Sequence, residues 1–223
     1  IYNEGQFEIF VPLKASTFAF QPDWPALTNL NIDLDFANNG LWMQAPQVAL
    51  GGVSVKNLSA AIPDYSKEKL LIDSDIQGPG DAVGPYFKET PLADSLGAAL
   101  DEIKIKGDVS ARLHLDIPLN GKMTTAQGNV RLQDNTLLIK PLNSTLSHVS
   151  GTFRFTNGEL HSDPLQATWF NQPVNLDFST TEGEKSYQVR VNLSGAWQSD
   201  KTGVLPAAIS EKLQGEIPWQ GKV

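Results

Sequence analysis

The sequence contains no cysteine, which excludes disulfide bridges and thiolate metal sites. It has three histidines, His114, His148 and His161, and their spacing does not match that of metal ligands. No apolar run approaches the roughly 20 residues that a membrane-spanning helix requires, and the sequence itself contains no signal peptide. Because the chain begins at Ile1 rather than at methionine, we expect it to be a segment of a longer protein.

Positive charge is also scarce. Lysine and arginine total 17 against 25 aspartates and glutamates, which gives a formal net charge of −8. Such a field repels phosphate backbones, so the composition argues against nucleic acid as a partner. It argues equally against attachment to an anionic membrane through a basic patch.

Catalytic motifs are missing. The sequence has no Gly-x-Ser-x-Gly elbow, no phosphate-binding glycine loop and no dinucleotide fingerprint. His161, Ser162 and Asp163 are hydrolase residue types, but neighbours on a strand point to opposite faces and cannot form a triad. Asp33 and Asp35 share one polar strand face, as a glycosidase pair would, although solvated strand charges are far commoner. We therefore predict no enzyme, no catalytic residues, no metal and no cofactor.

What the sequence does have is alternation of apolar and polar residues, most clearly over 107–123. There, apolar residues occupy every second position from Val109 to Ile117, with polar residues between them. Successive side chains of a strand point to opposite faces, so this stretch predicts a strand with one dry face and one wet face. Pro118 cannot donate a ladder hydrogen bond and should end it.

The same pattern recurs along the chain and predicts about 14 strands joined by tight turns, an antiparallel meander. Besides the stretch just described, the predicted strands cover residues 6–11, 16–20, 29–36, 41–43, 47–50, 53–62, 70–76, 124–132, 137–140, 144–156, 159–170, 174–178 and 187–193.

Helical spacing replaces this alternation only twice. Leu92, Leu96, Leu100 and Ile103 predict a short amphipathic helix over 91–102, with Thr90 as its N-cap. A second short helix is predicted over 204–213. The sequence Gly-Pro-Gly at 78–80 reads as a break between elements.

An internal repeat sets the expected domain organisation. The sequence Asp-Ile-Pro-Leu-Asn-Gly-Lys at 116–122 corresponds to Glu-Ile-Pro-Trp-Gln-Gly-Lys at 216–222, and a predicted helix precedes both copies. Repeats of this size indicate a quasi-linear architecture. We expect a first β-groove unit over 1–90, a helix and second β-groove run over 91–202, and the start of the next repeat over 203–223.

The dry strand faces must be covered. Three or four apolar side chains per strand, at roughly 1.5–3 kcal/mol each, sum to tens of kcal/mol, well above a domain's net stability of about 5–15 kcal/mol. Two helices about 16 Å long cannot cover a sheet about 65–70 Å long. The sheet should therefore pack on another sheet, close into a barrel, or curl around an apolar ligand.

Several motifs, taken in order, resemble those of the AsmA-like proteins of Gram-negative envelopes. They are Pro91-Leu92 opening a helix, the strand that follows Gly107 and ends at Ile117-Pro118, Gly128-x-Val130-x-Leu132, Leu137-x-Ile139-x-Pro141 and Val149-x-Gly151-x-Phe153-x-Phe155. The similarity is densest over 78–223.

This resemblance implies a periplasmic segment of a protein anchored in the inner membrane and built from repeating β-grooves. Such proteins move phospholipid from the inner to the outer membrane along an apolar channel, with the head groups in water. The expected fold is a long antiparallel meander curled into an open, U-shaped hydrophobic groove with two short α-helices. The expected partners are phospholipid, neighbouring repeats of the same chain, and envelope membrane proteins at either end.

If the resemblance holds, the apolar residues of the alternating strands line the groove and contact acyl chains. The predicted lining residues are Leu30, Ile32, Leu34, Phe36, Val109, Ala111, Leu113, Leu115, Ile117, Val130, Leu132, Val149, Phe153, Phe155, Val174, Leu176, Phe178, Val189, Val191 and Leu193. The alternative is a closed β-sandwich, a scaffold or binding module whose outer face engages an envelope protein or a glycan.

Overall fold

The structure, a computed structural model, describes residues 5–19, 21–50, 52–184, 187–198 and 216–222. The helix predicted over 204–213 lies outside the described residues. The strands are β1 Glu8–Phe18, β2 Leu27–Ala37, β3 Gly40–Leu50, β4 Val53–Ile62, β5 Lys69–Pro79, β6 Ile103–Lys106, β7 Asp108–Pro118, β8 Thr125–Ile139, β9 Ser144–Thr156, β10 Glu159–Ser162, β11 Leu165–Trp169, β12 Gln172–Glu182, β13 Tyr187–Gln198 and β14 Glu216–Lys222. The helical elements are η1 Tyr65–Lys67, α1 Gly80–Lys88, the π-helical turn η2 Ala93–Gly97, and α2 Ala98–Glu102.

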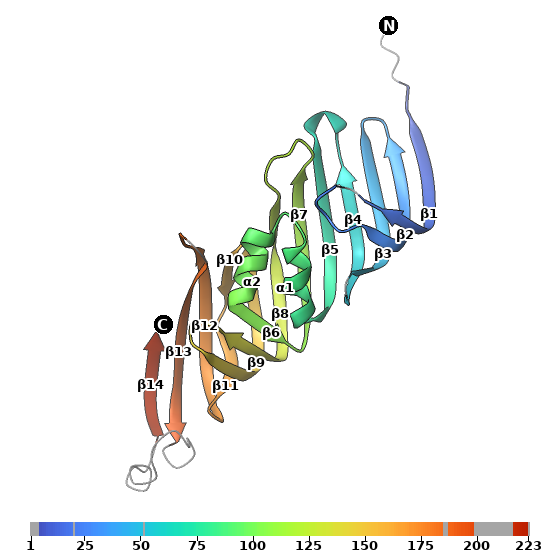
Figure 1. The fold of residues 1–223 in the computed structure, drawn as a ribbon. Coiled ribbons are helices and arrows are strands. Elements are labelled where there is room, and N and C mark those ends of the chain that lie inside the picture. The colour runs from blue at the N-terminus through green and yellow to red at the C-terminus, as the bar shows by residue number, and fades with distance from the viewer. Residues whose placement is uncertain (1–4, 20, 51, 185–186, 199–215, 223) are drawn as a thin grey trace.

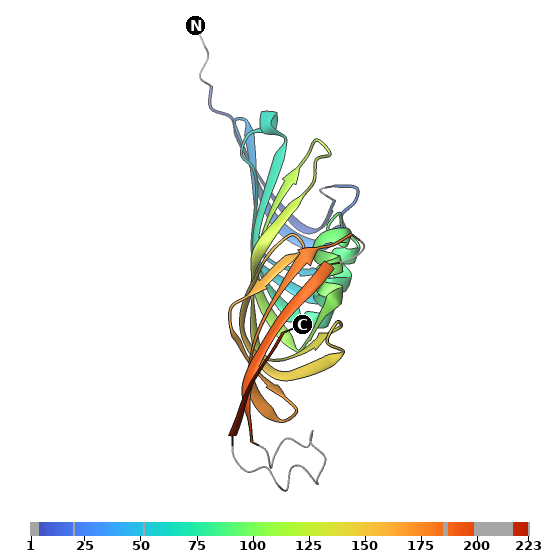
Figure 2. The ribbon, with the colours of Figure 1, turned by 90° about the vertical axis from the view of Figure 1, so that its left-hand side faces the viewer.

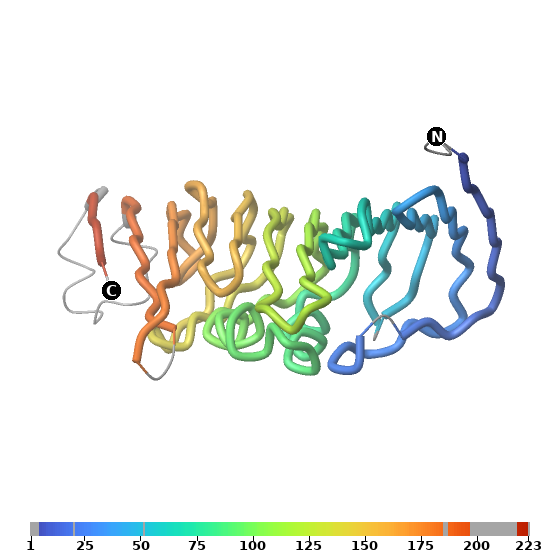
Figure 3. The backbone as a smooth tube through the Cα atoms, turned by 90° about the horizontal axis from the view of Figure 1, so that it is seen from above, coloured from blue at the N-terminus to red at the C-terminus, as the bar shows by residue number. Residues whose placement is uncertain are grey.

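These 14 strands form one antiparallel sheet, in which almost every strand pairs with its neighbour in the chain. The order is β1-β2-β3-β4-β5-β7-β8-β9-β10-β12-β13-β14, while β6 pairs with β8, and β11 pairs with β9 and β12. The strands follow one another along an elongated body from the N-terminal to the C-terminal end (Figures 1 and 3). The predicted meander is therefore confirmed. The sheet is open, so the closed sandwich and the barrel are not the fold of this chain.

Several predicted strands are in fact parts of longer ones. Most of 6–11 and residues 16–18 of the segment 16–20 belong to β1, 41–43 and 47–50 belong to β3, and 125–132 and 137–139 belong to β8. Pro12 does not break β1 because β1 is an edge strand, where a missing backbone donor is tolerated. In contrast, the single strand predicted over 159–170 is two, β10 and β11, separated at Asp163 and Pro164.

Strand register gathers the apolar residues on one face. A continuous row of paired residues crosses six strands from β1 to β7, and each member is apolar. The row consists of Val11, Leu34, Met43, Ala60, Ile72 and Leu115. The neighbouring row, which points to the opposite face, is mostly polar and includes Asp33, Gln44, Ser59, Asp73 and His114. The alternation in the sequence thus becomes one apolar face that the strands share.

The helices lie together on this apolar side, which is concave (Figure 2). The predicted helix over 91–102 is present from Ala93, as η2 followed by α2. The expected N-cap is wrong, because Leu92 holds that position, while the Thr90 hydroxyl accepts a hydrogen bond from the Leu92 backbone N–H at 3.2 Å within the preceding turn. Helix α1 was not predicted. It starts directly at Gly80, where we had expected a break, and it carries Pro85 inside it. Helix α2 also contacts β13, near the C-terminal end of the sheet, across the concave face.

A corner in the middle of the sheet bends the strands. Gly107, with φ of +92°, separates β6 from β7, and both strands pair with the long strand β8. Opposite this point the register of β8 shifts around Asn135, whose side chain is 1% exposed. Its amide donates hydrogen bonds to the carbonyls of Lys106 and Asp108, at 3.1 and 3.0 Å. The side chain therefore replaces the ladder bonds that the bend interrupts.

Candidate functional site

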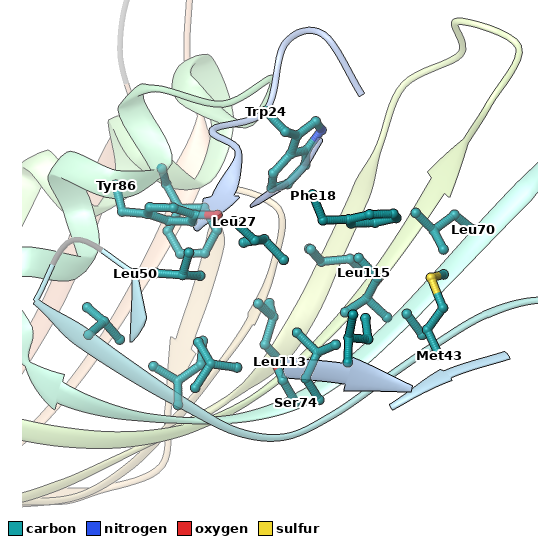
Figure 4. A pocket seen from close by; sticks show the side chains of 18 of the residues that line it. Phe18, Trp24, Leu27, Met43, Leu50, Leu70, Ser74, Tyr86, Leu113 and Leu115 are labelled. Carbon is teal, nitrogen blue, oxygen red and sulfur yellow. The ribbon is translucent and has the colours of Figure 1, made fainter. Parts of the chain in front are cut away.

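Two apolar cavities adjoin on the concave face. The first, the N-terminal cavity, lies between strands β2–β5 and β7 on one side and helix α1 on the other, and Phe18 and Trp24 also line it (Figure 4). Its volume is about 70 Å³. Its other lining residues are Leu27, Ile32, Met43, Leu50, Val53, Val55, Leu58, Ala60, Leu70, Ile72, Ser74, Ile76, Val83, Tyr86, Phe87, Leu113 and Leu115.

The second, the central cavity, lies between helices α1 and α2 and strands β5–β9, and its volume is about 310 Å³. An apolar cavity of about 150 Å³ already holds a benzene molecule and stays dry, so this one has room for part of an alkyl chain. Its lining residues are Ile76, Gly80, Asp81, Val83, Gly84, Pro85, Phe87, Lys88, Leu96, Leu100, Asp101, Ile103, Lys104, Ile105, Val109, Ala111, Leu113, Val130, Phe153 and Phe155.

The two cavities meet beneath α1, because Ile76, Val83, Phe87 and Leu113 line both of them. Together they form an apolar tract, which we call the groove, along the concave face from the end of β1 to β9. Helix α1 crosses it, with its apolar side chains turned toward the sheet.

Polar groups within the N-terminal cavity are few and uncharged. Ser74 is buried in the strand β5 part of the lining. Burial raises the pKa of Tyr86 to about 12, so its phenol stays neutral throughout the physiological pH range. The described residues include no cluster of His, Cys, Asp or Glu that could hold a metal ion. Such a lining can exclude water and accommodate hydrocarbon, but it offers no group for acid–base chemistry.

The structure divides the residues that the sequence predicts as groove lining into two groups. One group lines the cavities: Ile32, Val109, Ala111, Leu113, Leu115, Val130, Phe153 and Phe155. The others do not line either cavity: Leu30, Leu34, Phe36, Ile117, Leu132, Val149, Val174, Leu176, Phe178, Val189, Val191 and Leu193. Most of this second group is buried within the same hydrophobic cluster, and Phe36 and Val189 are partly buried against it. Their contact with lipid stays a prediction.

Beyond β9 the apolar side chains of the sheet are buried against one another. The rings of Phe153 on β9 and Phe178 on β12 lie 5.5 Å apart between centroids, and Leu146, Leu160 and Leu165 are fully buried. The described helices thus cover only part of the sheet, as their length predicts, and elsewhere the apolar residues are buried within the same cluster.

Sequence reasoning missed the helical side of the groove. Val83, Tyr86 and Phe87 on α1 follow the spacing i, i+3, i+4 of an amphipathic helix, so the pattern was available. It was hidden by the glycines and prolines around it. The strand residues of β3–β5 in the lining, such as Met43 and Ile72, belong to alternating stretches that had been recognised as strands.

A cluster of charged residues borders the central cavity. Asp101 on α2 accepts hydrogen bonds from Lys140, which follows β8, at 2.5 Å, and lies 3.0 Å from Lys88 on α1. Lys104 on β6 lies 4.0 Å from the same carboxylate. The hydrogen bonds from Lys140 and Lys88 lower the pKa of Asp101 to about 2. This carboxylate therefore joins four elements at one side of the groove.

The lowered pKa gives a pH-dependent contribution to stability. A depressed pKa stabilises the fold above the unfolded value near 3.8, and the contribution disappears as pH falls toward 2. Because the Asp101 side chain is 35% exposed, we expect Asp101→Asn to lower the free energy of unfolding by at most about 1 kcal/mol at neutral pH. Urea unfolding should show the difference vanish near pH 2, while the exposed Asp94→Asn control shows no such dependence. An undiminished difference at that pH would contradict the assignment.

An open antiparallel sheet with one continuous apolar face, enclosing apolar cavities under a short helix, defines a β-groove protein. The chain belongs to the YhdP family, since the family described as "YhdP protein" matches residues 2–223. It is 66% identical over 222 residues to the intermembrane phospholipid transporter YhdP of Escherichia coli strain K12, a match that covers the whole of this chain. The chain spans 18% of the length of that relative. No solved structure matches it.

None of the helices in the described part of the chain is long and apolar enough to cross a membrane.

Proposed function

We propose that this chain is a segment of an envelope protein that carries the acyl chains of phospholipids along its groove, between the inner and the outer membrane. One observation carries the proposal: the two cavities adjoin beneath α1, and apolar side chains line the N-terminal cavity almost wholly and most of the central cavity. The name of the E. coli relative, an intermembrane phospholipid transporter, supports phospholipid as the cargo. In this function the segment has no catalytic role.

The same proposal gives roles to the two ends of the sheet. Strands β1 and β14 each pair with one neighbour only among the described strands, which leaves backbone groups on their outer edges for further pairing. We propose that neighbouring repeats of a longer, inner-membrane-anchored chain continue the sheet there in the periplasm, and that envelope membrane proteins contact the ends of the whole assembly. The unit boundaries near residues 90 and 202 belong to this proposal.

Site-specific photo-crosslinking in the full chain tests the path of the lipid. A photoreactive residue at Leu113 or at Phe153 should capture phospholipid, because both side chains are buried on the concave face and line the central cavity. Arg112 and Arg154 are the matched controls, since each is the exposed neighbour on the same strand and points to the other face. Mass spectrometry of the adducts would identify the lipid. Equal capture from both faces would refute the groove as the path.

A further inference from the structure

The three lysines that surround Asp101, namely Lys88, Lys104 and Lys140, form a cationic group that we call the lysine rim. Their ammonium groups lie within 3.0, 4.0 and 2.5 Å of one carboxylate, so all three converge on one point. They come from α1, β6 and the end of β8, elements that the fold brings together. Each side chain stays accessible, with exposed fractions from 38% to 52%.

The lysine rim is short of negative charge. The three lysines face two carboxylates, Asp101 and Glu102, the latter 4.0 Å from Lys140. The group therefore has a net charge of +1 (three minus two). This excess occurs in a chain whose overall charge is −8. Asp81 also lines the central cavity, but it is in the first turn of α1, and Lys88 is the last residue of that helix. Seven residues of helix separate them by about 10 Å.

The lysine rim directly adjoins the hydrocarbon-like cavity. Lys88, Lys104 and Asp101 line the central cavity together with Leu96, Leu100 and the phenylalanines of β9. A phospholipid has a matching arrangement of polar and apolar parts, because its phosphate anion is next to two alkyl chains. Three ammonium groups converging on one point can donate to the several oxygens of a phosphate at once, and such charge-assisted hydrogen bonds are roughly twice as strong as neutral ones.

We propose that the lysine rim binds the phosphate of a phospholipid whose acyl chain occupies the central cavity, and that Asp101 holds the three lysines in place until the phosphate arrives. This inference rests on the proposed function and goes further, because it makes this part of the groove a station for the head group rather than a purely apolar surface. Asp101 competes with the phosphate for the same donors, so it keeps the binding reversible.

The test compares two lipids that differ only in the phosphate-bearing head group. The purified full chain is incubated with phosphatidylcholine vesicles that contain equal amounts of phosphatidylglycerol and of diacylglycerol with the same acyl chains, and the captured lipids are quantified by mass spectrometry. The wild type should prefer phosphatidylglycerol to diacylglycerol. The triple variant Lys88→Gln, Lys104→Gln, Lys140→Gln should lose this preference by about tenfold, the factor that about 1.4 kcal/mol of lost charge-assisted bonding represents, while still capturing diacylglycerol.

Two further variants separate binding from folding. Asp101→Asn frees the three lysines and should raise the preference for phosphatidylglycerol, whereas a purely structural role of Asp101 would lower the capture of both lipids. The matched control Lys56→Gln, Lys67→Gln, Lys69→Gln removes the same charge from exposed positions of β4, η1 and β5 that do not line the cavity. It should behave as the wild type does.

The outcomes are distinct. If the Gln variant of the lysine rim keeps the wild-type preference while both lipids are captured, the lysine rim is not a phosphate site, and the groove function stands. If the wild type captures no lipid at all, phosphatidylcholine included, the groove function fails and this proposal fails with it. Excess inorganic phosphate competes for the same ammonium groups, so it should lower the preference for phosphatidylglycerol toward the diacylglycerol level while diacylglycerol capture continues. A preference that persists in excess phosphate would contradict a phosphate site at the lysine rim.

Discussion

Asn135→Ala is expected to lower the free energy of unfolding by about 3 kcal/mol, because it removes three hydrogen bonds of a buried side chain that contribute about 1 kcal/mol each. The Asn135 amide donates to the carbonyls of Lys106 and Asp108, and its oxygen accepts from the backbone N–H of Gln133 at 2.7 Å. The side chain is 1% exposed, so water cannot readily replace it. Alanine would leave two carbonyls and one N–H without these partners at the corner between β6 and β7.

The matched control is Asn129→Ala, because Asn129 is an exposed asparagine on the same strand. Its replacement should change stability by no more than about 0.5 kcal/mol. Urea unfolding followed by circular dichroism measures both variants. Equal effects of the two substitutions would mean that the corner does not depend on Asn135. A correspondingly large effect confined to Asn135 would show that the corner between β6 and β7 depends on this one side chain.

This corner also shows where prediction from the sequence ends. The strands on either side of Gly107 follow from alternation, which depends only on residues two positions apart. From the sequence alone, Asn135 next to Asp134 is typical of a turn. The two carbonyls to which its amide donates lie 27 and 29 residues earlier in the chain. No local pattern contains that information, so the bulge became visible only in the folded sheet.

The helical part of the groove was missed for a different reason. Residues 78–80 read as a break, but Pro79 is the N-cap of α1 and costs the helix no hydrogen bond. The apolar face of Val83, Tyr86 and Phe87 was recognisable but was not used. The apolar strand faces were predicted well, whereas the location of the cavities depends on how far the sheet curls and where α1 crosses it.

Leu113→Asp is expected to block phospholipid passage almost completely. Leu113 lines both cavities at the point where they meet beneath α1, and it is 7% exposed. An alkyl chain that passes this point would have to displace the water held by a carboxylate, or bury the charge, at an effective cost of several kcal/mol. Since each 1.4 kcal/mol is a factor of ten, we expect transfer to slow by about a hundredfold or more. The measurement is the arrival of pulse-labelled phospholipid in the outer membrane of cells that contain the full chain.

Two variants separate polarity from folding. Leu113→Ala destabilises the fold by about 2–4 kcal/mol but leaves the groove apolar and wider, so transfer should continue in proportion to the amount of folded protein. Arg112→Asp places the same carboxylate one residue earlier, on the exposed face, and should leave transfer unchanged. If the Leu113→Asp variant, at the same abundance as the wild-type protein, transferred phospholipid at the wild-type rate, passage along this face would be refuted. Equal losses in the Asp and Ala variants would show that stability, rather than the apolar path, limits transfer, whereas loss in the Asp variant alone requires hydrocarbon to pass beneath α1.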